Sequence, residues 1–281
     1  MKILLLILSM FPTITLAELL HEEDFTNFEN NVRYSTGFSW GSGVSASIIQ
    51  DPDVSDNKVL SFKFDGSSDL SEDAFSEQRF DLGNIYSEIW IKYRLFIPNN
   101  YYHRQASSSS NAKGYIMLWS GSYSNQNNQA ATSWWPISNG STIMATKWRD
   151  EGNNYSEHFF TDSRGVTNPV AIDITKDLGK WQEVVIQVKT ADQNQANGII
   201  QVWKNGALLH SQTSIENWGQ NAEINGIEKG YILGWANAGF NEETVLLVDD
   251  FSVGTTAENI GFTPGKTPNP PSQFNVVSVQ Y

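Results

Sequence analysis

The sequence predicts an all-β protein in which two antiparallel sheets pack face to face as a sandwich. Apolar and polar residues alternate with a period of two in many short segments, which is the pattern of half-buried strands. Gly, Asn, Asp and Ser separate these segments, and none of them keeps the spacing of an amphipathic helix. We expect roughly a dozen strands, because a sandwich buries one face of each sheet.

The strands can be placed in order along the chain. In residues 88–97 every odd position is apolar, so this strand should turn one face to the core. Within 199–209, Asn205-Gly206 is a favoured pair for a two-residue hairpin turn. Further strands are expected at 59–64, 115–119, 181–189, 231–235 and 245–253.

The two ends of the chain lack the strand pattern of the middle. A signal peptide is predicted at 1–17, with a positive start at Lys2, an apolar run over 3–11 and a small-residue cleavage pattern at Thr15-Leu16-Ala17. The apolar run is too short for a membrane anchor. We therefore expect a secreted or periplasmic protein without a membrane span. One sandwich domain should occupy 18–258, followed by a Pro-rich linker and C-terminal tail at 259–281.

Composition narrows the chemistry. With 18 Lys and Arg against 31 Asp and Glu, the net charge of −13 argues against a nucleic-acid partner. The absence of cysteine excludes disulfides, thiolate nucleophiles and cysteine metal sites. The segment from Arg79 to Arg149, however, contains seven basic residues and only two acidic ones. Its net charge is +5, and the remaining residues of the chain carry −18. This segment predicts a site for an anionic ligand; the alternative is a chance cluster on solvated strands.

The same segment holds residues suited to β-elimination on a uronic-acid polysaccharide. That reaction needs a group to neutralise the carboxylate, a base for the adjacent ring proton and an acid for the leaving oxygen. Strand alternation places Arg79 beside Glu77, so Arg79, with Gln78 or Lys113, could neutralise the carboxylate. The alternative is that Arg79 simply pairs with Glu77.

The base and the acid have two candidates. Alternation predicts Lys113, Tyr115, Met117 and Trp119 on one strand face, and His103 follows the 88–97 strand in a loop. His103 or Tyr115 could transfer the protons; the alternatives are a structural histidine and a core tyrosine. Trp134, Trp135 and Trp148 predict a sugar-stacking platform or, equally, core. The predicted substrate-binding residues are Glu77, Gln78, Trp90, Arg94, Arg104, Trp119, Trp135 and Trp148.

Other reaction types are disfavoured. Hydrolysis needs a pair of carboxylates, and Glu183 lacks a second one two positions away. The four histidines are isolated, so metal catalysis has no ligand pattern. The chemistry requires no cofactor. A structural Ca²⁺ held by Glu23, Asp24 and Asp250 is predicted if the first and last strands are neighbours; the alternative is solvated acids.

Several segments resemble the concanavalin A-like jelly rolls of polysaccharide lyases, especially the heparin lyase I-like and alginate or glucuronan lyase groups. These segments are 76–83, 88–98, 113–119, 179–185, 202–206 and 248–251, and the resemblance covers about residues 22–254. It implies an antiparallel β-jelly-roll sandwich.

Alginate-lyase-like jelly rolls carry Arg-x-Glu-x-Arg, Gln-x-His and Tyr-x-Lys-x-Gly-x-Tyr strands. Here Glu77 and Arg79 match the end of the first strand, but Phe75 replaces its leading Arg. Gln-x-His is absent, and 113–115 matches the third strand loosely. The resemblance thus leaves Arg79, His103, Lys113 and Tyr115 as the catalytic candidates.

The predicted function is therefore a secreted polysaccharide lyase that cleaves a uronic-acid-containing polysaccharide by β-elimination. The alternative is a non-catalytic, lectin-like carbohydrate-binding or adhesin jelly roll. The expected partner is an acidic polysaccharide, and we expect a monomer.

Overall fold

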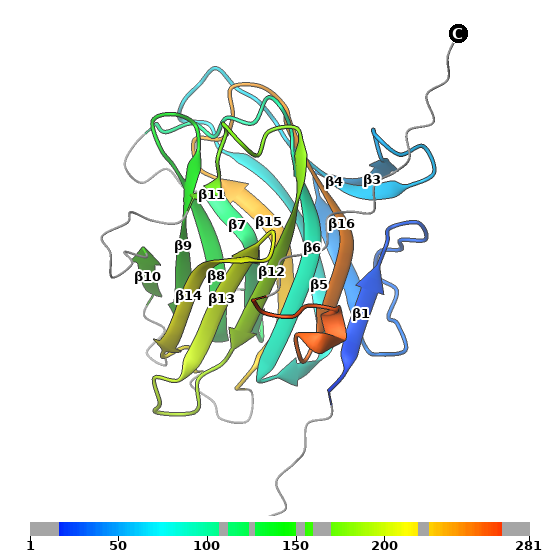
Figure 1. The fold of residues 1–281 in the computed structure, drawn as a ribbon, viewed down its shortest axis with the longest axis vertical. Coiled ribbons are helices and arrows are strands. Elements are labelled where there is room, and N and C mark those ends of the chain that lie inside the picture. Colours follow the sequence, from blue (N-terminus) through cyan, green and yellow to red (C-terminus); the bar gives the residue numbers. More distant parts are fainter. Residues whose placement is uncertain are drawn as a thin grey trace, which may run out of the picture.

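The computed structural model describes residues 17–106, 112–123, 127–149, 155–159, 170–218 and 225–265. Two eight-stranded antiparallel sheets pack face to face, which confirms the predicted fold class. In Figure 1 the first sheet lies in front of the second.

The chain crosses between the two sheets several times. The first sheet consists of β14 (Ala207–Ile215), β13 (Gly198–Lys204), β12 (Lys180–Lys189), β6 (Glu88–Ile97), β16 (Thr244–Gly254), β4 (Lys58–Phe64) and β3 (Ala46–Gln50), with β1 (Leu19–Glu23) paired to β16. The second consists of β10 (Tyr155–Phe159), β9 (Thr142–Arg149), β8 (Asn127–Pro136), β7 (Ala112–Ser120), β15 (Ile227–Ala236), β5 (Ala74–Tyr86) and β2 (Ser39–Val44), with β11 (Val170–Ile172) paired to β9. Strands β7 to β11 are consecutive along the chain and all belong to this second sheet.

The core lies between the sheets and follows the alternation in the sequence. All five odd residues of β6 are fully buried, as predicted. Four rings pack together on the other side of the core: Phe38 just before β2, Trp40 of β2, Phe80 of β5 and Phe251 of β16. The hairpin between β13 and β14 turns at Asn205 and Gly206, both with positive φ, as the Asn-Gly pair indicates.

One strand departs from strict alternation. In β7, Lys113 pairs with Ser133 and Met117 pairs with Ala131, so the three residues 114–116 lie opposite Thr132 alone. This bulge shifts the phase of the strand, and Tyr115 points into the core instead of sharing the face of Lys113 and Met117.

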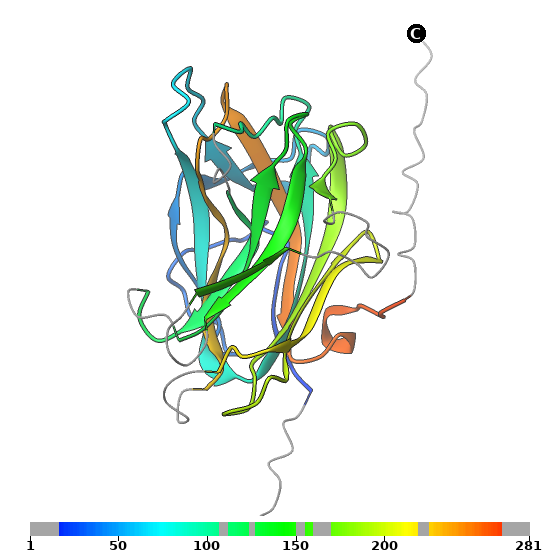
Figure 2. The ribbon, with the colours of Figure 1, turned by 90° about the vertical axis from the view of Figure 1, so that its left-hand side faces the viewer.

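The end of the domain packs on the outside of the first sheet. The short 3-10 helix η2 (Glu258–Ile260) and Phe262 cover the stacked rings of Trp90 and Trp203, whose centroids are 5.5 Å apart. Figure 2 shows this segment outside the first sheet, away from the second. The packed chain thus continues beyond residue 258.

The predicted leader and tail cannot be followed in the same way. Residues 1–16 of the predicted signal peptide and 266–281 of the predicted tail lie outside the described part of the chain. Within the described part, no helix is long and apolar enough to cross a membrane.

Candidate functional site

A set of polar and charged side chains covers the outer face of the second sheet. The sheet's inward residues, such as Phe80, Leu118 and Trp148, belong to the core, so their neighbours along each strand point outward. We call this surface the cationic face and define it by Glu77, Arg79, Lys113, Met117, Trp119, Tyr123, Gln129, Lys147, Arg149 and Tyr231. Four of these residues are cations and one is an acid, although Lys147 is only 4% exposed. Beside them on β15, Lys229 pairs with Asp81 and Glu228. Cations remain in excess, so the face favours an anionic ligand.

Arg79 and Glu77 form an ion pair on β5. Arg79 Nε donates to Glu77 Oε1 at 2.5 Å; the Glu77 side chain is 1% exposed and that of Arg79 is 35% exposed. Burial raises the pKa of Glu77, although the Arg79 hydrogen bond and charge act against that rise. Glu77 Oε2 is buried without a hydrogen-bond partner. The predicted pairing is therefore present, but it leaves a third of the Arg79 side chain open to a ligand.

Two tyrosines stand next to this pair. The Arg79 guanidinium lies 4.6 Å from the centroid of the Tyr123 ring, an exposed side chain that follows β7. Beneath it, Tyr231 of β15 is directly opposite Arg79 in the strand register. Gly230 faces the core, which turns Tyr231 outward. Burial, and then the neighbouring Tyr123, raise the pKa of Tyr231 well above its usual range, so this phenol stays neutral.

A chain of polar contacts extends from Tyr231 across β7, β8 and β9. The Tyr231 hydroxyl donates to Met117 Sδ at 2.7 Å, and Gln129 Nε2 lies 3.7 Å from the same sulfur. Arg149 Nε donates to Gln129 Oε1 at 2.6 Å. These contacts hold Arg149 in line with Arg79 and Tyr231, so the face is an ordered array.

Lysines and a tryptophan complete the face. Lys147 Nζ lies 5.5 Å from the centroid of the Trp135 ring. A Cβ added to Gly234 would touch both Lys113 and Tyr231, so these two side chains flank the same backbone position. The structure thus brings together the predicted residues Glu77, Arg79, Lys113, Trp119 and Trp135.

The other basic residues of the 79–149 segment lie elsewhere. Arg94 is on the outer face of the first sheet, where it contacts Asp249, Asp250 and the Trp181 ring. Lys92 is on that same face, opposite Ser252. The segment is contiguous in sequence but is divided between two sheets, so its charge of +5 is not one site.

Arg104 has a structural position. Its guanidinium is buried and donates to the backbone carbonyls of Ser67, Glu72 and Ala238. These hydrogen bonds join three loops at one end of the sandwich.

His103 is also buried beside those loops. Its Nε2 lies 3.0 Å from the Asn237 carbonyl oxygen, and its ring packs near Phe240. Burial lowers the pKa of His103 to about 4, so the ring is neutral at ordinary pH. It does not reach the cationic face.

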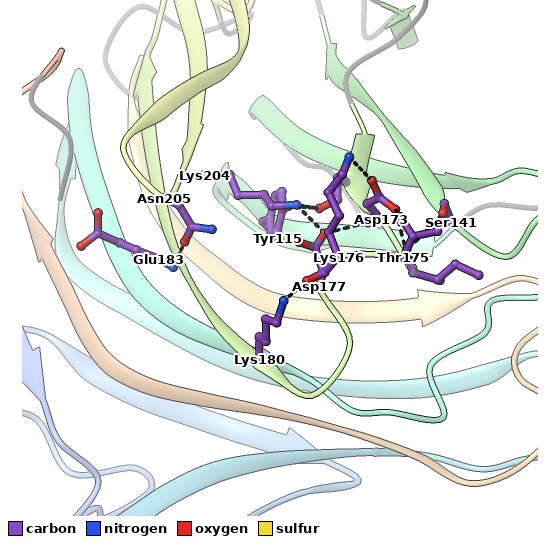
Figure 3. Close-up of polar contacts among 12 residues, drawn as sticks. Tyr115, Ser141, Asp173, Thr175, Lys176, Asp177, Lys180, Glu183, Lys204 and Asn205 are labelled. Carbon is purple, nitrogen blue, oxygen red and sulfur yellow. Dashed lines mark hydrogen bonds and ion pairs between the residues drawn. The ribbon is translucent and has the colours of Figure 1, made fainter. Parts of the chain in front are cut away.

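Tyr115 lies in the core because the β7 bulge turns its side chain inward. Its hydroxyl donates to the Ala171 carbonyl at 3.0 Å, and Lys204 Nζ donates to the same oxygen. Lys204 also pairs with Asp177 at 2.5 Å, and Figure 3 shows the three side chains together. Burial, and then the charge of Asp177, raise the pKa of Tyr115 well above its usual range. The geometry gives Tyr115 no access to a ligand on the face.

The remaining predicted binding residues are also dispersed. Trp134 and Trp148 are buried in the core, so of the three proposed platform rings Trp135 alone lies on the cationic face. Trp90 is covered by η2 on the first sheet. Gln78 is buried against β2, where its amide donates to the Gly41 carbonyl. Alternation predicts which strand face a residue lies on. It does not predict whether a neighbouring segment covers that face.

The first and last strands are neighbours, as the calcium prediction requires. β1 pairs with β16, which places Glu23 opposite Phe251. The Glu23 carboxylate turns inward, however, and accepts hydrogen bonds from the Phe25 amide, Tyr34 and Trp40. Nowhere in the described part of the chain do three Asp, Glu, His or Cys side chains gather closely enough to hold a metal ion. The geometry lends the calcium prediction no support.

A hollow of about 620 Å³ does lie at these terminal strands, on the first sheet. Five acids line it against two cations: Glu22, Glu23, Asp24, Glu183, Asp250, Lys92 and Arg94. This charge repels a polyanion. The cationic face is therefore the better candidate for an anionic ligand.

Sequence reasoning missed Tyr231, Tyr123 and Gln129 of this face. One signal for Tyr231 was present, because Lys-Gly-Tyr occurs at 229–231 as well as at 113–115. Tyr123 follows β7 outside any strand, and no period indicates where a loop side chain will lie. Gln129 lies in β8, a strand that the sequence did not predict.

Comparison with known proteins supports the fold. No protein-family model matches the sequence, and no curated protein matches it significantly. Among solved structures the chain is similar to an endo-β-1,4-glucuronan lyase from the fungus Trichoderma reesei, with 13% identity and a TM-score of 0.55 over 79% of this chain and 93% of that one.

Two alginate lyases are similar to the same extent. One is from a Chlorella virus, with 11% identity and a TM-score of 0.51 over 78% of this chain and 93% of that one. The other is a variant of the lyase Aly36B in complex with an alginate trisaccharide. It has 11% identity and a TM-score of 0.51 over 83% of this chain and 96% of that one. The chain therefore has the jelly-roll fold found in polysaccharide lyases.

Proposed function

We propose that the protein cleaves a uronic-acid-containing polysaccharide by β-elimination on the cationic face. The observation that carries this proposal is the grouping of Arg79, Lys113 and Arg149 with two tyrosines on one outer sheet face. Cations there would hold a polyanion, and the tyrosines would supply proton transfer. The fold shared with glucuronan and alginate lyases is consistent with this chemistry.

Each part of the reaction has a residue on the face. Arg79 neutralises the substrate carboxylate, which stabilises the negative charge that develops when the adjacent ring proton is removed. A deprotonated Tyr123 takes that proton and becomes a neutral phenol; the bond to the glycosidic oxygen then breaks, and a carbon–carbon double bond forms in the ring. Tyr231, held neutral by burial, donates its proton toward the leaving oxygen. Lys113 beside Tyr231 adds positive charge.

The alternative is a carbohydrate-binding protein without catalysis, and one observation favours it. The Tyr231 hydroxyl is buried against Met117 beneath Tyr123, so proton donation requires Tyr123 to move aside. A binding protein needs only the cations and rings of the face.

One assay separates these functions. Alginate, polyglucuronate and other uronate polymers are incubated with the protein, and the ultraviolet absorbance of unsaturated ends is followed. β-Elimination raises the absorbance, whereas binding alone leaves it unchanged.

Variants then locate the site. Arg79→Ala should lower turnover by on the order of 10²-fold, because its contact strengthens in the transition state. Tyr231→Phe and Tyr123→Phe should lower turnover with little change in affinity. Arg94→Ala is the matched control: its side chain is 39% exposed on the other sheet and should leave turnover unchanged. Full turnover in all three face variants would refute this placement of the active site.

A further inference from the structure

Two exposed aromatic side chains lie side by side at one end of the cationic face. Phe75 of β5 and Trp235 of β15 are directly opposite each other in the strand register. They are 38% and 51% exposed, whereas the next pair along the strands, Ala74 and Ala236, belongs to the core. Directly opposed side chains project from the same side of a sheet, so both rings point outward with Glu77 and Arg79.

The aromatic pair continues the face. Phe75 lies two residues before Glu77 and four before Arg79, and four residues of a strand span about 13 Å. On β15, Trp235 follows Gly234, the position flanked by Lys113 and Tyr231. A span of about 13 Å exceeds one sugar ring, so the two ends of the face would contact different sugar units of one chain.

Apolar rings in this position need a partner suited to them. Each ring leaves a large apolar surface in water beside charged residues, and neither is needed to fill the core. The C–H face of a pyranose ring is apolar and stacks on aromatic side chains, while its hydroxyls stay in water. The carboxylate of a uronate would instead bind Arg79, four residues further along β5.

We propose that Phe75 and Trp235 form a stacking subsite for a pyranose unit near the one that Arg79 binds. This inference rests on the proposed function of the cationic face. It gives the face two kinds of contact: charge at Arg79 for a uronate, and apolar stacking at Phe75 and Trp235 for another sugar of the same polymer. A fragment must then be longer than a disaccharide to occupy both.

The test compares fragments of different length. Affinities of polyglucuronate and alginate disaccharides and hexasaccharides are measured by calorimetry for the parent protein, Trp235→Ala, Phe75→Ala and Trp235→Tyr. Trp235→Ala should bind the hexasaccharide roughly tenfold more weakly, the change expected when about 55 Å² of apolar surface stays uncovered. Disaccharide affinity should not change, and Trp235→Tyr should restore most of the loss.

Salt and a matched control sharpen the result. Because stacking is not screened, the ratio of parent to Trp235→Ala affinity should be the same in low and high salt. Leu208→Ala, which removes another exposed apolar side chain on the first sheet, should have no effect. Equal affinities of parent and Trp235→Ala for the hexasaccharide, or an equal loss with both lengths, would overturn the subsite and leave the proposed function standing. A parent protein that binds neither fragment would overturn both.

Discussion

At the scale of single residues, burial decides how His103 behaves. Its pKa is about 4 in the folded protein and about 6.5 when exposed. The unfolded chain therefore binds more protons than the folded chain between these values, and stability falls as the pH drops through that window. By pH 4 the loss from this residue is on the order of 3 kcal/mol.

His103→Gln should remove that acid sensitivity. An amide does not titrate and can still donate to the Asn237 carbonyl. Urea unfolding of parent and variant at pH 7, 5.5 and 4 measures the effect. As the pH falls, the unfolding free energy of the parent should decrease more than that of the variant. Two parallel pH profiles would show that His103 does not titrate during unfolding.

The same scale shows how far the sequence predicts the site. Alternation predicts that Glu77 and Arg79 share a strand face, as they do, because it depends only on local geometry. Arg104 has the same side chain as Arg79 but is buried, since loops cover it, and Trp148 lies in the core between the sheets. Which cation stays exposed is a tertiary property. Tyr231 joined the site through its pairing with Arg79, across more than a hundred residues of sequence.

At the scale of elements, the strands were predicted better than their irregularities. β6 was predicted with its observed ends, and β12 to within one residue, because their alternation is unbroken. In β7 the bulge moves Tyr115 from the predicted face to the core. A bulge is set by the partner strand, here β8, so the β7 sequence alone does not indicate it.

Gly83 in β5 offers a test at this scale, with Gly265 after η2 for comparison. Gly83 and Gly265 both have a φ of +80°, but a Cβ on Gly83 would overlap the Gly37 backbone, whereas one on Gly265 would meet nothing within 4 Å. Gly265→Ala should cost about 1 kcal/mol of unfolding free energy from backbone strain alone. Gly83→Ala should cost about 1–3 kcal/mol more, because β2 and β5 must separate.

Thermal and urea unfolding of both variants measure this difference. Gly265→Ala serves as the control, since it carries the same φ without the close approach. Equal destabilisation by the two substitutions would mean that the contact between Gly37 and Gly83 does not constrain the sheet.

At the scale of the whole molecule, charge is distributed unevenly over an acidic protein. The chain carries −13 overall, yet the cationic face holds four basic side chains and one acid, while the hollow on the other sheet is lined by five acids and two cations. The cationic face and the acidic hollow thus carry opposite charge on different sheets. This arrangement orients a polyanion toward the second sheet and repels it from the first.

Salt should weaken the binding of an acidic polysaccharide for this reason. The screening length falls from about 10 Å at 0.1 M to about 3 Å at 1 M ionic strength, so exposed attraction to the cations is largely lost over that range. Affinity for polyglucuronate or alginate is measured at several salt concentrations for the parent protein, Lys113→Gln and Lys92→Gln. Lys113→Gln should bind more weakly and with a shallower salt dependence. Lys92→Gln changes a lysine of the acidic hollow and should keep the parent's slope. A preference for neutral glucans, or binding that does not depend on salt, would contradict a polyanion site on the second sheet.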